Sequence, residues 1–301
     1  MTPLLEDALS SVIASLESGV APWRKPWSSG KIPSLPLRST GDAFSGMNAV
    51  LLSSLQAMRG YDNPFWLTFN QAQEAGGHVR KGERAAPAIL YKTRCVDGDA
   101  GDGSDDKVLR FLKSYGVFNA CQIEGLPDSF YPAPDVEKPE GGAPLNEDVL
   151  AIMQNFPVPV SHGGDVACYY ILSDRISMPP RATFETDEDY VAVLLHEFGH
   201  ATGAKHRLDR FEPNETRADY AREELVAELT SHLTSMHLGI NPSRSVFANH
   251  IAYLGHWAGF LKEKPAELLK AAGKAQAAAE MILSYRPATA KFDEPNLSEA
   301  A

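Results

Sequence analysis

The stretch HEFGHATGAKH, from His196 to His206, carries the most specific signal in this chain of 301 residues. It contains His-Glu-x-x-His, which places His196 and His200 one turn apart on the same face of a helix. Two imidazoles in this arrangement bind zinc, and the intervening Glu197 is the residue type that takes a proton from water. Apolar residues surround the motif, and the acidic segment ETDEDY precedes it. We therefore predict a helix over residues 187–202 that carries a catalytic metal site.

The third metal ligand has two candidates. His206 stands at the spacing of the metzincin motif. The helix predicted over residues 217–237 contains Glu-Leu-Val-Ala-Glu, from Glu224 to Glu228, which resembles the second metal-binding helix of gluzincins. That resemblance makes Glu224 the ligand, Ala227 a small residue that lets the two helices approach closely, and Glu228 an acid that orients a ligand histidine. We favour Glu224 and keep His206 as the alternative, and we expect Glu223 to face solvent.

The composition restricts the class of protein. No run of apolar residues approaches the roughly 18 that a membrane span needs, and the N-terminus reads as an amphipathic helix rather than a signal peptide. The three cysteines are scattered and form no Cys-x-x-Cys pair, which argues against a disulfide framework. We therefore expect a cytoplasmic protein with no membrane partner.

The net charge of −11 is unevenly distributed. Residues 1–127 contain 13 cationic and 13 acidic residues and are neutral, whereas residues 128–301 contain 15 cationic and 26 acidic residues. Five acids of the first part fall in one Asp/Gly-rich segment at 97–106, which we predict to be a hairpin loop. Outside that loop the first part is mildly basic, which suits an acidic partner.

The chain divides at a Pro/Gly-rich segment. Residues 128–145 read as a linker between a first domain at 1–127 and a second domain at 146–301. Periodicity predicts helices up to residue 18 and at 46–59, 68–75, 187–202, 217–237, 245–263 and 265–283, and strands at 86–94, 108–119, 166–172 and 176–178. The predicted fold class is α+β, with helices behind a small antiparallel sheet in the second domain.

A series of segments spread over residues 20–240 forms a wider pattern. They are PWRKPW (Pro22–Trp27), FSGMNAVLL (Phe44–Leu52), GYDNPFWLTFNQAQEAGGHVRKGE (Gly60–Glu83), YGVFNACQIEGL (Tyr115–Leu126), HEFGHATG with RLDR (Arg207–Arg210), and YAREELVAEL (Tyr220–Leu229). In this order and spacing they resemble the ArdC-type antirestriction proteins of conjugative plasmids, which are related to the N-terminal part of plasmid TraC primases. The last 60 residues carry no motif of this kind.

The resemblance implies an N-terminal domain that binds single-stranded DNA and a C-terminal zincin-like metallopeptidase domain of the gluzincin type. It also implies a role in protecting incoming plasmid DNA from restriction. Members of the family lack a histidine at the position of His206, which again favours Glu224 as the third ligand.

Several aromatic and cationic residues fit the binding of single strands. Bases stack on aromatic rings, which contributes about 1–3 kcal/mol per base, and cations follow the phosphates. The candidates are Trp23, Arg24, Lys25, Trp27, Trp66, Arg80, Lys81 and Arg84. Phe65 and Phe69 are expected in the core instead.

The combined prediction is Zn²⁺-dependent hydrolysis of a protein substrate, with Mn²⁺ or Co²⁺ as alternative metals. Glu197 transfers the proton, and Tyr220, Tyr253 or His206 stabilises the oxyanion. Two alternatives remain open: a DNA-coating protein whose metal site is structural, and an effector protease that acts away from DNA. The presence of Glu197 beside both histidines favours catalysis, because a structural zinc site does not need that acid.

Overall fold

A computed structural model describes residues 2–24, 35–96, 107–132, 145–211, 216–243 and 251–287. The helices are α1 (Pro3–Glu17), α2 (Gly46–Arg59), α3 (Phe69–Glu74), α4 (Glu147–Asn155), α5 (Asp187–Ala201), α6 (Arg217–Leu238), α7 (Ile251–Glu263) and α8 (Ala266–Leu283), with short 3₁₀ helices η1 (Pro22–Arg24), η2 (Ala120–Gln122), η3 (Asp128–Phe130) and η4 (Arg181–Thr183). The strands are β1 (Trp66–Leu67), β2 (His78–Val79), β3 (Ala86–Val96), β4 (Lys107–Asn119), β5 (Ile123–Glu124), β6 (Val160–His162), β7 (Cys168–Tyr170) and β8 (Arg175–Met178).

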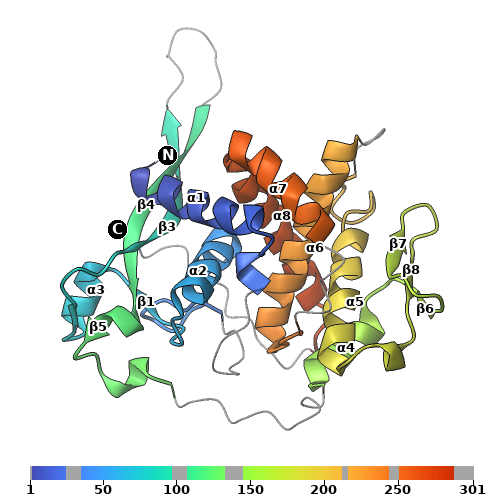
Figure 1. The fold of residues 1–301 in the computed structure, drawn as a ribbon, viewed down its shortest axis with the longest axis horizontal. Helices are drawn as coiled ribbons and strands as arrows, with labels where there is room; N and C mark the ends of the chain where they lie inside the picture. The colour runs from blue at the N-terminus through green and yellow to red at the C-terminus, as the bar shows by residue number, and fades with distance from the viewer. Residues whose placement is uncertain are drawn as a thin grey trace.

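The N-terminal half is built on the long hairpin of β3 and β4, which pair antiparallel from Ala86 opposite Val117 to Val96 opposite Lys107. α1 turns its apolar stripe inward and packs with α2 beside the hairpin (Figure 1). α2 ends at Gly60, whose φ of 71° is a conformation that glycine adopts without strain. The helices and strands predicted for this half are confirmed, and the predicted Asp/Gly loop lies outside the described residues.

A small lobe sits at one end of the hairpin, where β1 pairs with β4 and β2 pairs with β5. Thr68 begins α3 with a capping box, because its hydroxyl accepts from Gln71 N while the Gln71 side chain accepts from Thr68 N. The short strands of this lobe, β1, β2 and β5, are each two residues long. They are too short for an alternation of apolar and polar residues to predict them.

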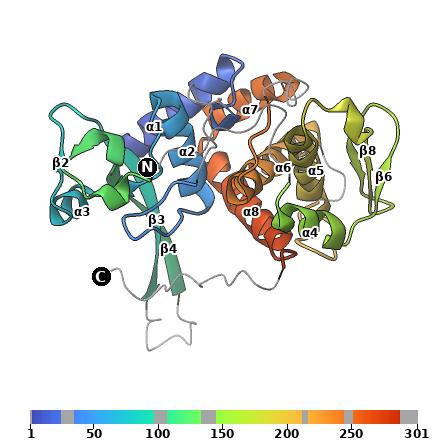
Figure 2. The same cartoon turned by 90° about the horizontal axis from the view of Figure 1, so that it is seen from below.

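The C-terminal half places a small sheet in front of α5 and α6, in the strand order β6-β8-β7. Figure 2 shows this sheet and the α3 lobe at opposite ends of the molecule. The two predicted strands, β7 and β8, pair antiparallel as expected, but the sheet is mixed because β6 runs parallel to β8. α4 and β6 were not predicted, whereas α5 and α6 match their predicted ranges to within a residue.

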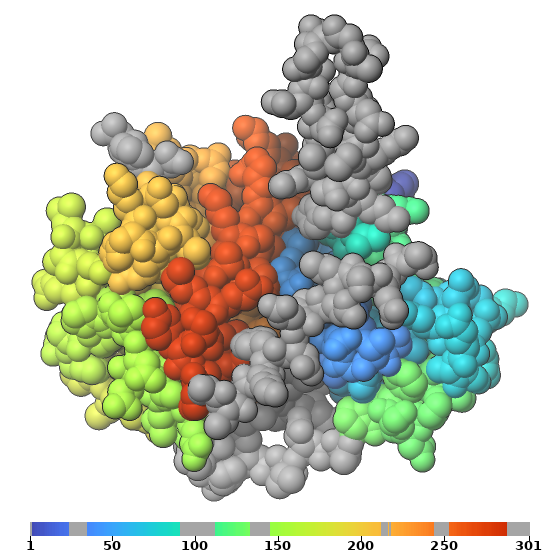
Figure 3. All heavy atoms as spheres, turned by 180° about the vertical axis from the view of Figure 1, so that it is seen from behind, coloured from blue at the N-terminus to red at the C-terminus, as the bar shows by residue number. Residues whose placement is uncertain are grey.

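One apolar core joins the two halves of the chain. Buried residues of α1 and α2 pack in the same cluster as buried residues of α6, α7 and α8. The backbone N–H of Gly46, at the start of α2, donates to Gln276 Oε1 of α8 at 2.7 Å. Figure 3 shows the red surface of the C-terminal helices lying between the two halves. Residues 128–145 therefore divide the sequence into two predicted domains without dividing the core. Part of that segment, residues 133–144, lies outside the described residues.

Within the described ranges, none of the helices combines the length and the apolar character that crossing a membrane requires.

Candidate metal centre

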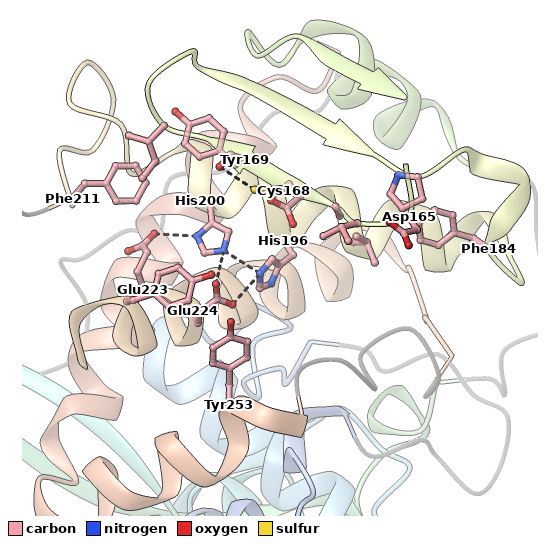
Figure 4. Close-up of a pocket in the computed structure, with 17 residues that line it drawn as sticks. Asp165, Cys168, Tyr169, Phe184, His196, His200, Phe211, Glu223, Glu224 and Tyr253 are labelled. Atoms are coloured by element: carbon pink, nitrogen blue, oxygen red, sulfur yellow. Dashed lines mark hydrogen bonds and ion pairs between the residues drawn. The ribbon is translucent and has the colours of Figure 1, made fainter. Parts of the chain in front are cut away.

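α5 and α6 bring three potential metal donors together. His196 and His200 leave one face of α5, and their Nε2 atoms lie 3.1 Å apart. Glu224 of α6 faces them, with one carboxylate oxygen 3.6 Å from His196 Nε2 and the other 3.4 Å from His200 Nε2. The donor atoms lie within 4.8 Å of one another, and Figure 4 shows the three side chains pointing toward one point.

Small residues allow the two helices to approach. A Cβ at Gly199 of α5 would lie 3.1 Å from Ala227 Cα and 3.3 Å from Thr230 Cβ, both on α6. Ala227 is itself fully buried. The predicted role of Ala227 as the small residue at a close helix contact is consistent with this packing, and Gly199 is the other half of the same contact.

Gly199→Ala is expected to lower the free energy of unfolding by about 1–3 kcal/mol, because the added methyl group must push α5 away from α6. Urea unfolding followed by circular dichroism measures the change. Gly273→Ala in α8 is the matched control, since a Cβ there meets nothing within 4 Å and alanine favours a helix. Equal effects of the two substitutions would contradict the close-contact explanation.

The donor set fits a divalent metal of the zinc type. Two imidazole nitrogens and one carboxylate form the ligand set of catalytic zinc sites. Burial alone raises the pKa of Glu224, but hydrogen bonding to His196 and His200 outweighs it and holds that pKa well below its ordinary value. For His200, burial lowers the pKa, and the carboxylates of Glu223 and Glu224 together raise it above its usual range. The raised pKa of His200 reflects the negative potential of the neighbouring carboxylates, which also favours a cation at this point, and the lowered pKa of Glu224 keeps that carboxylate ionised.

Glu223 also belongs to the site, and the prediction that it faces solvent is wrong. It is 8% exposed, its Oε1 lies 3.8 Å from His200 Nδ1, and it forms an ion pair of 2.6 Å with Arg210. Arg210 also donates to Gly199 O and Thr202 Oγ1, both at 2.7 Å. Glu223 therefore faces the outer nitrogen of His200, and Arg210, the second arginine of the RLDR segment, is the sequence signal that could have indicated a buried acid.

His206 lies away from the donor cluster. Its side chain is 62% exposed and pairs with Asp174 at 3.2 Å on the turn between β7 and β8. The alternative assignment of His206 as third ligand is therefore wrong in this structure, because the chain turns outward after α5. The neighbouring Arg207 fixes that turn by donating to both carboxylate oxygens of Asp174, at 2.8 and 2.9 Å.

Glu228 lies beneath His196, as predicted. It is 1% exposed, and its Oε2 lies 3.9 Å from His196 Nδ1. Its Oε1 accepts a hydrogen bond of 3.2 Å from the indole of Trp23. The prediction that Trp23 stacks on DNA bases is therefore wrong, because this ring is 4% exposed and belongs to the shared core.

The other DNA-binding candidates fall into three groups. Trp66 is 1% exposed and donates to Gln56 Oε1 at 3.4 Å, so the prediction that it binds DNA is also wrong. Arg80, Lys81 and Arg84 are exposed, and Arg80 pairs with Glu83 at 2.7 Å. Lys25, Trp27 and the side chain of Arg24 lie outside the described residues.

A pocket of about 520 Å³ opens over the donor cluster. Glu197, which is 6% exposed, lines it together with both histidines and Glu224. Its other lining residues are Asp165, Val166, Ala167, Cys168, Tyr169, Ile171, Pro179, Phe184, Val193, Phe211, Tyr220, Glu223 and Tyr253. Tyr220 and Tyr253, two of the predicted oxyanion donors, line the pocket, whereas His206 does not.

Comparison with known proteins finds two family models that match this chain. Residues 3–118 match the model of the N-terminal domain of anti-restriction factor ArdC, and residues 147–274 match that of a zincin-like metallopeptidase. The protein y4eC of Sinorhizobium fredii is 33% identical over 93% of this chain and 92% of its own length. A DNA primase TraC of Escherichia coli is 33% identical over 94% of this chain, which spans only 27% of the primase.

Two crystal structures of the antirestriction protein ArdC from plasmid R388 share the fold. The metal-free structure is 36% identical with a TM-score of 0.77, covering 94% of this chain and 98% of that one. The Mn(II)-bound structure is 34% identical with a TM-score of 0.75, covering 95% and 98%. This chain therefore belongs to the ArdC antirestriction family, and its second half is a zincin-like domain that implies a metal cofactor.

Proposed function

We propose that this chain protects incoming conjugative plasmid DNA from host restriction by binding single strands without sequence preference and by hydrolysing a protein at its metal centre. The observation that carries the hydrolytic part is the presence of Glu197 in the pocket beside His196, His200 and Glu224. A site that only stabilises the fold needs no acid at that position and no open pocket above it.

The metal we propose is Zn²⁺, with Mn²⁺ or Co²⁺ as alternatives, held by His196, His200 and Glu224. The Mn(II)-bound structure of R388 ArdC supports a divalent ion. When bound, such an ion acts as a Lewis acid toward a peptide carbonyl and toward water. Glu223 and Glu228 orient the two imidazoles through their outer nitrogens.

Glu197 performs the proton transfers in this proposal. Its carboxylate takes a proton from the attacking water and returns it to the leaving amine. Tyr220 and Tyr253 line the pocket and offer hydroxyl groups to the developing oxyanion. Burial and the neighbouring Glu224 and Tyr253 raise the pKa of Tyr220, so its hydroxyl stays protonated and available as a donor.

Glu197→Gln tests the hydrolytic part in a conjugation assay against a restricting host. Loss of a general base lowers the rate of hydrolysis by about 10²–10⁴-fold, so we expect protection to fail while metal content and DNA binding persist. His206→Gln, an exposed change outside the pocket, is the control and should protect fully. Full protection by Glu197→Gln would favour a DNA-coating protein. If Glu197→Gln loses protection and the unmutated protein does not bind DNA, the result would favour an effector protease.

The DNA-binding part is supported by family membership and by the surface of the α3 lobe. Arg80, Lys81 and Arg84 are exposed there. Phe69 is 49% exposed, so the expectation that it lies in the core is wrong, and it offers a ring on which a base can stack. We propose that this lobe contacts the single strand. Binding should weaken steeply with salt and should prefer single strands over duplex.

Phe69→Ala is expected to weaken single-strand binding by about 1–3 kcal/mol, because one stacking platform is lost. Fluorescence anisotropy with a labelled oligonucleotide measures the affinity. Tyr170→Ala is the matched control, since Tyr170 is a 43% exposed aromatic on β7 at the opposite end of the molecule. Equal affinities of the two variants would remove the α3 lobe from the binding surface.

A further inference from the structure

The carboxylate of Glu228 joins the N-terminal half of the chain to the metal centre. One oxygen, Oε1, accepts the Nε1–H of Trp23 at 3.2 Å across 205 positions of sequence. The other, Oε2, lies 3.9 Å from Nδ1 of His196. Trp23 belongs to η1 and falls within the region that matches the ArdC N-terminal domain, whereas Glu228 and His196 belong to the zincin-like region.

All three groups are withdrawn from water. Trp23 and His196 are each 4% exposed, and Glu228 is 1% exposed. A buried carboxylate is held in place by the donors around it, and a buried indole N–H needs an acceptor. The hydrogen bond from Trp23 therefore fixes one oxygen of Glu228 and so sets the direction in which the other oxygen points.

Packing holds the Trp23 ring in that position. Its centroid lies 6.5 Å from that of Trp257 on α7. The Trp257 indole in turn donates to Ala221 O of α6 at 2.9 Å, and its ring stacks on Tyr253 at 6.3 Å. The indole of Trp23 is thus anchored to both α6 and α7, the helices that supply Glu224 and Tyr253 to the pocket.

We propose that Trp23 is a positioning residue of the metal centre, acting through Glu228 on His196. A histidine ligand donates its second N–H to an outer acceptor, which fixes the ring and strengthens the ligand. A shift of roughly 1 Å would bring Oε2 of Glu228 from its present distance to a hydrogen bond with Nδ1. The N-terminal half thereby completes the metal site. By linkage, the factor by which its docking raises the metal affinity is also the factor by which bound metal strengthens its docking. This inference rests on the proposed metal centre.

Trp23→Phe tests the relay, with Trp66→Phe as the matched control. Both substitutions remove a buried indole N–H and the same volume, but Trp66 donates to Gln56, away from the metal. We expect Trp23→Phe to weaken Zn²⁺ and Mn²⁺ binding about 10-fold, the lower end of the range for losing the direct partner of a ligand histidine, and Trp66→Phe to leave both affinities unchanged. The visible absorption of the Co²⁺-loaded protein should also change only in Trp23→Phe, since it reports the ligand field.

Two further measurements exclude a merely structural effect. In the double variant Trp23→Phe/Glu228→Gln, the loss of metal-binding free energy should be less than the sum of the losses in the two single variants, because both substitutions act through one carboxylate. In the unmutated protein, the indole N–H resonance of Trp23 should shift on addition of Zn²⁺ while that of Trp66 stays in place. Additive losses, or equal affinities of Trp23→Phe and Trp66→Phe, would overturn the inference. If the unmutated chain binds none of these metals, the proposed function itself fails.

Discussion

Glu224→Ala should abolish tight metal binding, with a loss in Zn²⁺ affinity above the roughly 10–100-fold that removal of an outer partner causes. The carboxylate of Glu224 faces both imidazoles from α6, and its removal leaves two nitrogen donors on α5. Two donors do not complete the three-ligand set of a catalytic zinc site. The change itself is small in packing terms, because it shortens one side chain at the wall of a pocket.

Isothermal titration with Zn²⁺ and Mn²⁺ measures this loss, and His206→Ala is the control. His206 is the ligand of the competing metzincin arrangement, but its ring is exposed and pairs with Asp174. We expect the affinity of His206→Ala to equal that of the unmutated chain. A loss of affinity in His206→Ala with binding retained in Glu224→Ala would reverse the ligand assignment.

Arg210→Met should lower the free energy of unfolding by about 3–5 kcal/mol, the cost of removing one partner of a buried ion pair. The Arg210 side chain is 5% exposed and the Glu223 side chain 10% exposed, so little water reaches the acid that is left behind. Arg210 also donates to Gly199 O near the end of α5, and that bond is lost too. Because Glu223 faces Nδ1 of His200, metal affinity should fall in the same variant.

Urea unfolding and metal titration separate these two effects. Arg207→Met is the matched control, because the Arg207 side chain is also buried (7% exposed) but pairs with Asp174 on the β7–β8 turn, which is not one of the metal donors. It should lose stability without losing metal affinity. Adding Glu223→Gln to Arg210→Met should recover part of the stability, since the uncompensated charge is removed. Equal metal affinities of Arg210→Met and Arg207→Met would show that Glu223 does not orient His200.

Much of the fold was predictable because its signals are local. α5 and α6 are each begun by a threonine whose side chain accepts from the third residue of the helix, and α6 ends at Gly239 with a φ of 68°. The strands β3 and β4 are long enough to show alternation. The strands of the α3 lobe and the parallel pairing of β6 with β8 were missed, since two or three residues carry too little pattern.

The sequence by itself determined the part of the site that lies within one helix turn. The spacing of His196 and His200 and the position of Glu197 between them follow from helix geometry alone. The resemblance of Glu224–Glu228 to the second helix of gluzincins also predicted a small residue at Ala227. These relations depend on a few neighbouring positions and need no knowledge of the rest of the chain.

Only the tertiary structure decided which side chains reach the site from elsewhere. Trp23 and Trp66 lie in segments with cationic neighbours, as a DNA-binding surface would, yet both are buried, while Phe69 is exposed. Glu223, which was expected to face solvent, is buried because it pairs with Arg210. His206, the alternative ligand, lies at the surface, where it pairs with Asp174. The physical reason is the same in each case. Burial and pairing depend on what packs opposite a residue, and for Trp23 that partner is Glu228, 205 positions further along the chain.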